Sequence, residues 1–196
     1  PDGKKFALVL SHDVDSIKGY KKCLELMKLE QEIGFKSTFN FVPEGYNCSP
    51  ETRQILIDNG FGLGLHGLTH DGRVFQNKKK FNRAVPRING YLHDWQIKGF
   101  SSPSMLGNLD WISQVDIDYD CSTFDTDPFE PQANDVETIF PFIVVNSNRT
   151  CSFVELPYTL PQDHCLFIIL KEKDISLWQK KLDWIVSQGG MALLNT

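Results

Sequence analysis

A repeated alternation of short apolar runs and amphipathic segments constrains the fold of this chain more than any other feature. Residues 6–11 form a continuous apolar run, which is typical of a strand buried on both faces of a parallel sheet. Apolar residues at helical spacing follow over 16–33, and Gly34 stands where such a helix would end. Because strand and helix then alternate, we expect the strands to pair in parallel.

The same order recurs along the rest of the chain. Further strands are predicted at 37–42, 61–65, 99–102, 117–122, 153–156, 166–170 and 191–194. Helices are predicted at 50–59, 75–96, 109–115 and 175–188, and Pro86 and Gly90 should kink or split the second of these. Residues 123–149 show little periodicity and are expected to form a long surface segment. This tally favours an α/β fold, either a barrel or a doubly wound sheet.

Length and charge limit the classes of protein that the chain can belong to. With 196 residues, 41% of them hydrophobic and 23% charged, it is expected to be one soluble domain spanning 1–196. The net charge of −5 and the lack of a basic run longer than 78–80 argue against a nucleic-acid partner. No apolar run is long enough for a membrane span. The oligomeric state stays open, and a cytoplasmic location is slightly favoured.

The five cysteines do not suggest a structural role in cross-linking. They are odd in number, widely spaced and lack a Cys-x-x-Cys pair. This pattern argues against a disulfide framework and against a thiolate zinc site. We therefore expect most of them to be buried or idle thiols.

Two carboxylates and two imidazoles follow predicted strands. Asp13 and Asp15 come after the first strand, two residues apart, so both side chains should point to one side and repel each other unless a cation or a shared proton relieves them. His66 and His70 follow the third strand, and they would share a face if 67–69 formed a helical turn. Each pair alone also fits a purely structural role. The carboxylates could cap a helix, and the imidazoles could belong to surface or core histidines.

Their joint placement favours a metal site. The carboxyl ends of parallel strands gather on one face of an α/β fold, so the two pairs are expected to converge. Two histidines and one carboxylate would leave positions on a divalent ion for water, which is a catalytic arrangement. The second carboxylate would then be free to act as a general base.

In combination, the motifs resemble the polysaccharide deacetylases that share the NodB homology domain, carbohydrate esterase family 4. The resemblance rests on five segments that cover nearly the whole chain. They are Leu-Ser-His-Asp-Val-Asp at 10–15, Ser-Thr-Phe-Asn-Phe-Val at 37–42, His-Gly-Leu-Thr-His at 66–70, Asp-Tyr-Asp-Cys-Ser at 118–122 and Met-Ala-Leu-Leu-Asn-Thr at 191–196.

This resemblance implies a distorted (β/α) barrel of about seven parallel strands and metal-dependent removal of N-acetyl groups from an amino-sugar polysaccharide or oligosaccharide. It implies that Asp13 is the general base and that Asp15, His66 and His70 hold a divalent metal, zinc most often and cobalt or manganese in some members. It also implies that the backbone N–H of Ser104 helps to stabilise the oxyanion. The expected partner is therefore an N-acetylated carbohydrate.

The chain departs from the family pattern at two places. Ser101 stands where the family carries an Arg that binds the catalytic carboxylate, and Arg73, Arg83 or Arg87 could supply a guanidinium from elsewhere. The family's general-acid His is expected just after Thr196, so the domain is interpreted as truncated at its C-terminus. Asp125 and Asp127 lie near the place of a family Asp that orients that His, and their role is left open.

Two alternatives to the deacetylase remain. The Asp-x-Asp variant of the first motif also occurs in relatives that act on small molecules, which allows a hydrolase of another non-peptide C–N bond of the cyclic amide type. The Ser at position 101 motivates a third hypothesis, a catalytically impaired barrel that only binds carbohydrate.

Overall fold

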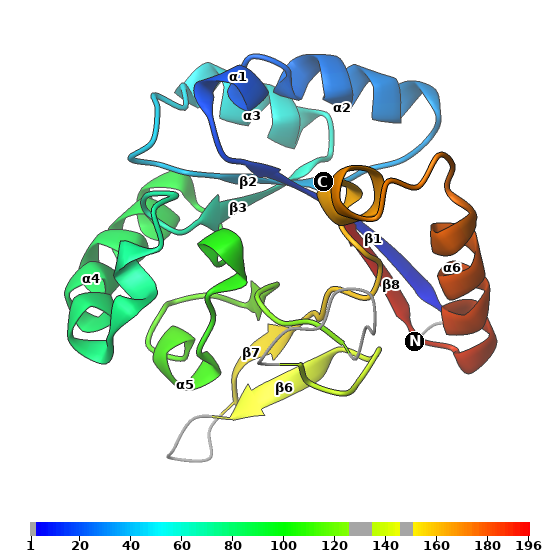
Figure 1. Ribbon diagram of the computed structural model, residues 1–196. Coiled ribbons are helices and arrows are strands. Elements are labelled where there is room, and N and C mark those ends of the chain that lie inside the picture. The colour runs from blue at the N-terminus through cyan, green and yellow to red at the C-terminus, as the bar shows by residue number, and fades with distance from the viewer. Residues whose placement is uncertain (1–2, 126–134, 146–150) are drawn as a thin grey trace.

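One curled sheet forms the centre of the protein (Figure 1). The computed structural model describes residues 3–125, 135–145 and 151–196. Within these residues the sheet has eight strands in the order β6-β7-β5-β4-β3-β2-β1-β8. All neighbours are parallel except β6 and β7. The strands are β1 (Ala7–Val14), β2 (Thr38–Phe41), β3 (Gly62–His66), β4 (Gly99–Ser101), β5 (Tyr119–Asp120), β6 (Phe142–Val145), β7 (Cys151–Glu155) and β8 (Met191–Asn195).

Helices surround the sheet on its outer side, with α1, α2 and α3 together on one flank, α4 and α5 on the next, and α6 beside β1 and β8 (Figure 1). None of the described helices is long and apolar enough to cross a membrane. Their bounds are α1 (Ile17–Tyr20), α2 (Cys23–Glu32), α3 (Pro50–Asp58), α4 (Lys78–Trp95), α5 (Leu109–Ile112) and α6 (Ser176–Gln188), with short turns of other helical type at η1 (Arg73–Gln76), η2 (Pro103–Met105) and η3 (His164–Ile169).

The predicted barrel of about seven parallel strands is confirmed, because seven of the eight strands run parallel. The antiparallel strand β6 was not predicted, since it lies within the segment 123–149 that was expected to be irregular. Residues 142–145 form a short continuous apolar run like those of the predicted strands, but the side chains at 143 and 145 are exposed, as expected of an edge strand covered on one face.

Alternation along β2 separates the core from the interior of the barrel. Phe39 and Phe41 are fully buried and pack in the main cluster with Met27 and Leu56 of the covering helices. Asn40, between them, points to the opposite face of the strand, which is the inner face of the barrel. The outer face of the sheet thus carries the hydrophobic core, and the inner face is free for polar groups.

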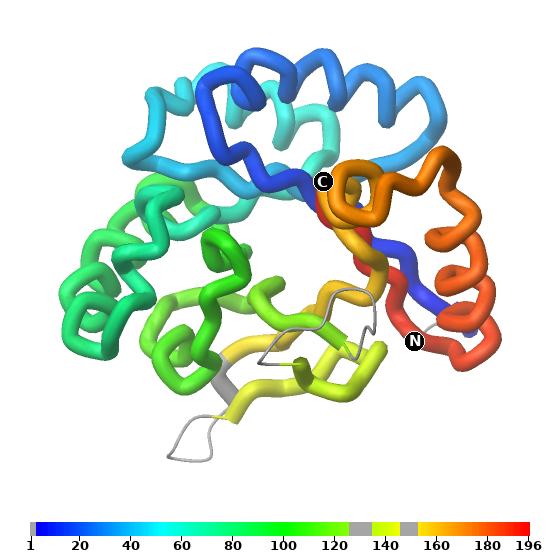
Figure 2. Tube along the Cα trace, in the orientation of Figure 1, coloured from blue at the N-terminus to red at the C-terminus, as the bar shows by residue number. Residues whose placement is uncertain are grey.

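The barrel is closed by a segment that follows β7 rather than by a further strand pair. The backbone N–H groups of Thr159 and Leu160 both donate to the carbonyl of Leu193 in β8. The Thr159 hydroxyl donates to the carbonyl of Met191 at 2.9 Å and accepts the N–H of Leu193 at 2.7 Å. Figure 2 shows this segment, between yellow and orange, passing beside the red trace of β8.

The strand predicted at 166–170 is wrong. Residues 166–169 belong to the π-helical turn η3, which begins at His164 after the N-cap residue Asp163 and has Leu170 as its C-cap residue. Only Leu166 of the apolar run is fully buried, and Ile168 and Ile169 are more than 60% exposed. A run of five apolar residues cannot separate a strand from a helical turn that buries one side, and burial here is one-sided.

The helix boundaries differ from the prediction at two places. Helix α4 continues through Pro86 and Gly90 without a break, whereas the segment 16–33 divides into α1 and α2. In α4, Pro86 lies on the exposed side, and four apolar residues at helical spacing pack against the sheet. Burial of that stripe holds the helix together at the proline, where one backbone hydrogen bond is missing. The stripe consists of Phe81, Ala84, Ile88 and Leu92.

Two carboxyl groups are buried inside the barrel, Asp120 at the end of β5 and Glu155 at the end of β7. Both side chains are inaccessible to solvent. The Ser122 hydroxyl donates to Asp120 at 2.6 Å, and the Thr123 hydroxyl donates to Glu155 at 2.6 Å. Burial raises the pKa of Asp120 well above its usual value, and the neighbouring Glu155 raises it further. Burial also raises the pKa of Glu155.

A proton held by this pair should make stability depend on pH. Because the pKa of Asp120 is higher in the folded protein than in the unfolded chain, folding binds a proton and stability falls as the pH rises above about 4. Asp120→Asn removes this proton uptake. Relative to wild type, we expect the variant to gain more than about 1 kcal/mol between pH 5 and pH 8, measured by urea denaturation across that range.

The exposed Asp118, two residues earlier on the same segment, provides the matched control. Asp118→Asn should follow the wild-type pH dependence. If Asp120→Asn also follows the wild-type curve, the folded protein does not take up a proton at this pair.

Candidate metal centre and its cavity

Parallel register places the first motif beside the second strand. Strand β1 runs to Val14, three residues further than predicted, so Asp13 lies within the strand rather than in a turn after it. Two backbone hydrogen bonds with Thr196 hold this extension. The N–H of Asp13 donates to the carbonyl of Thr196, and the N–H of Thr196 donates to the carbonyl of Ser11. Asp13 is thereby fixed opposite Asn40 of β2.

The second pair of the motif is brought together by a glycine turn and not by the helical turn that the spacing suggested. His66 ends β3, and Gly67 then adopts a left-handed conformation with φ +63°. A Cβ atom at this position would lie 2.6 Å from the Pro103 ring, so both the backbone angle and the space require glycine. The chain turns back, and the rings of His66 and His70 stack with centroids 5.2 Å apart.

Asp15, His66 and His70 form a cluster of donor atoms. One ligand atom from each lies within 4.8 Å of the others, and no second group of this kind occurs among the described residues. The Asp15 Oδ1 atom is 3.4 Å from His66 Nε2 and 3.3 Å from His70 Nε2. The His66 side chain is 2% exposed, and that of His70 is 34% exposed, so the cluster has one buried and one open side.

The cluster fits a tetrahedral divalent ion. Two ligands that bind zinc at about 2.0–2.2 Å in tetrahedral geometry lie about 3.3 Å apart, which agrees with the two separations around Asp15. Imidazole nitrogen and carboxylate oxygen are also ligand types that zinc accepts. Three protein ligands would leave one position for water or substrate.

The electrostatics of Asp15 are those of a carboxylate that lacks a strong counter-charge. Burial raises its pKa, and nearby Asp13 raises it further, while the imidazoles of His66 and His70 act in the opposite direction. A cation between these groups would favour the ionised carboxylate.

Asp13 lies beside this cluster but is held by amide groups. Asn40 Nδ2 donates to its Oδ1 atom at 2.9 Å, and Asn195 Nδ2 donates to its Oδ2 atom at 2.8 Å. The Ser11 hydroxyl donates to Asn195 Oδ1 at 2.8 Å, which fixes the orientation of that amide. His66 Nδ1 is 3.5 Å from Asp13 Oδ1. The carboxylate is therefore aimed by two neutral donors, Asn40 and Asn195, which were not among the predicted site residues.

Space for Asn40 is provided by the next strand. Gly64 lies opposite it in β3, and a Cβ atom there would be 2.2 Å from Asn40 Oδ1. The signal in the sequence was a polar residue between two phenylalanines in a predicted buried strand, which marks a side chain turned to the interior of the barrel.

Ser101, which replaces the Arg that the family resemblance led us to expect, is fully buried. Its hydroxyl lies 3.2 Å from His66 Nδ1 and 3.3 Å from the hydroxyl of Tyr158. Burial raises the pKa of Tyr158, and the carboxylate of Asp13 raises it further, so the phenol stays protonated. A serine and a tyrosine thus occupy the side of His66 where a guanidinium was expected.

A cavity of about 310 Å³ opens over the cluster. Ser104, the residue predicted to supply a backbone N–H, lines it with a left-handed φ of 55°. Three polar residues at the start of η3 and just before it also line the cavity and were not anticipated, because the segment after them was predicted to be a strand. The lining includes Asp13, Asp15, His66, His70, Ser102, Ser104, Gln162, Asp163, His164 and Asn195.

The two further histidines lie elsewhere. His12 is 2.6 Å from the Thr196 hydroxyl through Nδ1 and 3.0 Å from Glu30 through Nε2, so both ring nitrogens are engaged. His93 is exposed on α4 beside Asp94. Of the histidines outside the metal cluster, His164 is the one that lines this cavity among the described residues.

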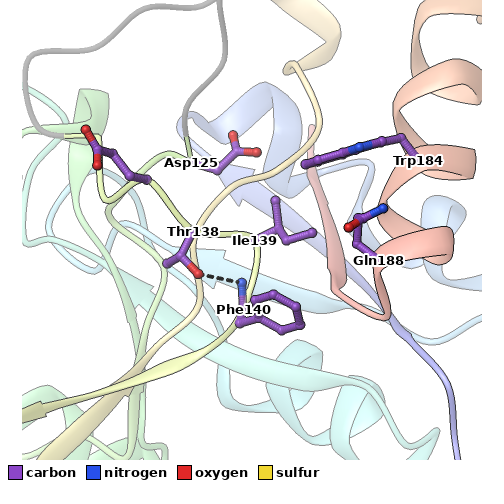
Figure 3. Close-up of a pocket in the computed structure, with 7 residues that line it drawn as sticks. Asp125, Thr138, Ile139, Phe140, Trp184 and Gln188 are labelled. Atoms are coloured by element: carbon purple, nitrogen blue, oxygen red, sulfur yellow. Dashed lines mark hydrogen bonds between the residues drawn. The ribbon is translucent and has the colours of Figure 1, made fainter.

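Asp125 belongs to a different cavity, at the seam between the segment 137–140 and α6. Figure 3 shows Trp184 and Gln188 of α6 facing Ile139 and Phe140, with Asp125 at the level of Trp184. Asp125 is 3% exposed and forms an ion pair with Lys181 at 3.1 Å. Asp125 is not among the described residues that line the cavity of Asp13. Asp127 lies outside the described residues.

The arginines that could have replaced the missing guanidinium also lie apart from Asp13. Arg73, Arg83 and Arg87 line a separate cavity between the loop after β3 and α4. None of these arginines contacts Asp13 in the part of the chain that the structure describes. Asn40 and Asn195 therefore hold Asp13 without help from these guanidinium groups.

Comparison with known proteins gives similarity in structure only. No protein-family model and no curated protein sequence matches the chain. Among solved structures, a Mycobacterium smegmatis protein provisionally described as a polysaccharide deacetylase superposes with a TM-score of 0.75 at 17% identity, covering 100% of this chain and 77% of that one. The allantoinase PuuE gives 0.67 at 13% identity, covering 100% and 78%.

A third similar structure is a carbohydrate esterase family 4 pseudoenzyme from Bacillus anthracis, with a TM-score of 0.56 at 12% identity, covering 98% of this chain and 55% of that one. The chain therefore has the fold of the polysaccharide deacetylases, and the resemblance drawn from its motifs is confirmed at the level of the fold.

The metal cluster can be tested by binding alone. We expect the protein to bind one equivalent of zinc, and His70→Ala to weaken that binding by at least about 100-fold, because loss of a direct ligand costs no less than the loss of an outer one. His93→Ala, on the exposed side of α4, is the control and should bind as wild type does. Isothermal titration gives both constants, and equal affinity in the two variants would contradict the cluster.

Proposed function

We propose that this protein is a metal-dependent hydrolase that removes N-acetyl groups from an amino-sugar oligosaccharide or polysaccharide. The observation that carries the proposal is the separation of roles in one cavity. Asp15, His66 and His70 offer three ligand atoms, and Asp13 stands beside them held by amides rather than grouped with the ligands. The deacetylase fold supports the same conclusion.

Asp15, His66 and His70 would hold the ion, with zinc the best fit to their donor atoms. When bound, a divalent ion supplies Lewis acidity, which polarises the acetyl carbonyl and lowers the pKa of water. Ser101 Oγ and Asp13 Oδ1 lie on the Nδ1 side of His66, so that nitrogen can donate its hydrogen and Nε2 would be free to hold the ion.

Asp13 acts as the general base in this proposal. Its Oδ1 and Oδ2 atoms each accept one amide hydrogen bond, which leaves lone pairs free on both oxygens to take a proton from the attacking water. Neutral donors fix its direction without the additional positive charge that an arginine would bring.

The backbone N–H of Ser104 would donate a hydrogen bond to the carbonyl oxygen of the acetyl group. Its backbone N–H belongs to a left-handed turn at the rim of the same cavity. A hydrogen-bond donor already in place stabilises the negative charge that develops on the oxygen when the carbonyl is attacked.

The strongest alternative is an impaired barrel that binds carbohydrate without turnover. It is motivated by Ser101 and by the similarity to a pseudoenzyme. A hydrolase of another C–N bond is the second alternative, since one of the similar structures is an allantoinase. Direct assays separate all three.

The principal test is acetate release from N-acetylglucosamine oligomers by the zinc-loaded protein. Asp13→Asn keeps the size of the side chain but replaces one carboxylate oxygen with an NH2 group, so the side chain loses one of its two acceptors and cannot take the proton. We expect activity to fall at least about 100-fold, with zinc affinity unchanged within about twofold. Release of acetate by Asp13→Asn at the wild-type rate would rule out its role as the base.

A lack of acetate with measurable oligosaccharide binding would favour the impaired barrel. Hydrolysis of a cyclic amide in place of the acetylated sugar would favour the second alternative. Either result would replace the proposed activity.

The amides of Asn40 and Asn195, which we call the amide clamp because both donate to Asp13, give a separate prediction. Asn40→Ala removes one hydrogen bond to a charged group, so kcat should fall about 10-fold to 100-fold, while KM changes little. Unchanged kcat in a folded Asn40→Ala variant would show that the clamp does not position the base.

A further inference from the structure

Positive charge is concentrated in one segment of an otherwise acidic chain. The protein carries a net charge of −5, yet residues 72–92 contain six Lys and Arg side chains and no acidic one. This segment forms η1 and most of α4. Such segregation is unusual, because basic and acidic residues are mixed along most surface helices.

Four of these basic side chains meet at one cavity of about 300 Å³. We call it the basic pocket and define it by Arg73 of η1 and by Lys80, Arg83 and Arg87 of α4. The loop after β3 forms its other wall through Leu68 and Thr69, beside α4 in Figure 1.

The arrangement does not serve the stability of α4. Lys80, Arg83 and Arg87 are three and four residues apart and share one face of the helix, where like charges repel. The first turn of α4 holds three lysines and no acidic residue, although the positive end of the helix dipole favours acidic side chains there. Selection for stability alone would disfavour both features.

Neutralisation within the pocket is incomplete. Arg87 pairs with Glu44, and Arg73 Nε is 3.3 Å from Asp71 Oδ2. Lys80 contacts only the neutral amide oxygen of Gln76, and Arg83 has no hydrogen bond or ion pair within the described parts of the chain. Two exposed positive charges, on Lys80 and Arg83, therefore remain for a ligand.

The basic pocket adjoins the candidate metal cavity. Thr69 lines the basic pocket, and the next residue, His70, lines the cavity with Asp13. A single loop thus separates a cationic subsite from the proposed reaction centre. A sugar chain that places one unit over the metal cluster could place a neighbouring unit over Arg83.

We propose that the basic pocket binds an acidic group, a carboxylate or a sulfate, on a sugar unit next to the one that is deacetylated, so that the preferred substrate is an acidic N-acetylated polysaccharide. Arginine donates paired hydrogen bonds to such groups, and lysine adds a point charge. This inference rests on the proposed function for the position of the acetylated unit, while the binding of the acidic unit can be measured without turnover.

The test compares equilibrium binding of three oligosaccharides of equal length at about 0.15 M salt, where charges outside the pocket are screened. A hyaluronan fragment carries carboxylates, a keratan sulfate fragment carries sulfates, and a chitin fragment is neutral. We expect wild type to bind at least one acidic fragment about tenfold more tightly than the neutral one. Lys80→Gln with Arg83→Gln should abolish that preference and leave chitin binding unchanged.

Lys78→Gln with Lys79→Gln is the matched control, because it removes the same charge from the same helix outside the pocket lining. It should keep the preference within about twofold, since exposed charges outside the pocket act weakly through salt-screened solvent. If the two double variants lost the preference for acidic fragments equally, the cause would be a general charge effect, and the proposed role of the basic pocket would be overturned.

Two other results would also overturn the inference. Wild type could bind the three fragments equally, or it could bind an oligonucleotide of matched charge through Lys80 and Arg83 as tightly as the sugars. Failure of the proposed activity is distinguishable, since acetate would then be absent from every fragment while the binding preference and its loss in Lys80→Gln with Arg83→Gln persist.

Discussion

Asn40 donates to Asp13 because β1 and β2 pair in parallel with these two residues opposite each other. This contact depends on a register that the hydrophobic side chains of β2 set from the other face of the sheet. Phe39 and Phe41 are buried among the helices, so a shift of one residue would exchange them with Asn40 and place an amide in the core. Packing on the outer face of β2 therefore fixes the direction in which the Asp13 carboxylate points.

The neutral clamp changes the electrostatic character of the site relative to an arginine. A guanidinium would stabilise the ionised form of Asp13 by its charge, whereas two amides provide direction with smaller dipoles. An ion held by Asp15, His66 and His70 would then act on Asp13 without the competing charge of an adjacent arginine.

Sequence reasoning located the strands at the centre of the sheet, because a short continuous apolar run bounded by turn residues is typical of a strand buried on both faces. It also placed Asp13, Asp15, His66 and His70 at one rim, because parallel strands share their carboxyl ends. It failed where burial is one-sided, as in η3 and β6, since apolar content there does not distinguish a strand from a helical turn or a surface segment.

Contacts between distant segments also escaped prediction. The meeting of Asn195 with Asp13 depends on β8 closing against β1, which leaves no local pattern in the sequence. The turn at Gly67 was expected to be helical, and its actual form depends on the Pro103 ring, which occupies the space of any larger side chain. Such features arise from tertiary packing and are visible only when both partners are in place.

The close approach of Gly64 to Asn40 has an evolutionary consequence. Any side chain at position 64 would occupy the space of the Asn40 amide oxygen, so the two positions cannot vary independently. A lineage that acquired alanine at 64 would have to shorten residue 40 and hold its carboxylate by another donor. An exchange between amide and guanidinium holders of the carboxylate would therefore need coordinated changes on neighbouring strands, because a replacement at position 64 alone would displace the Asn40 amide.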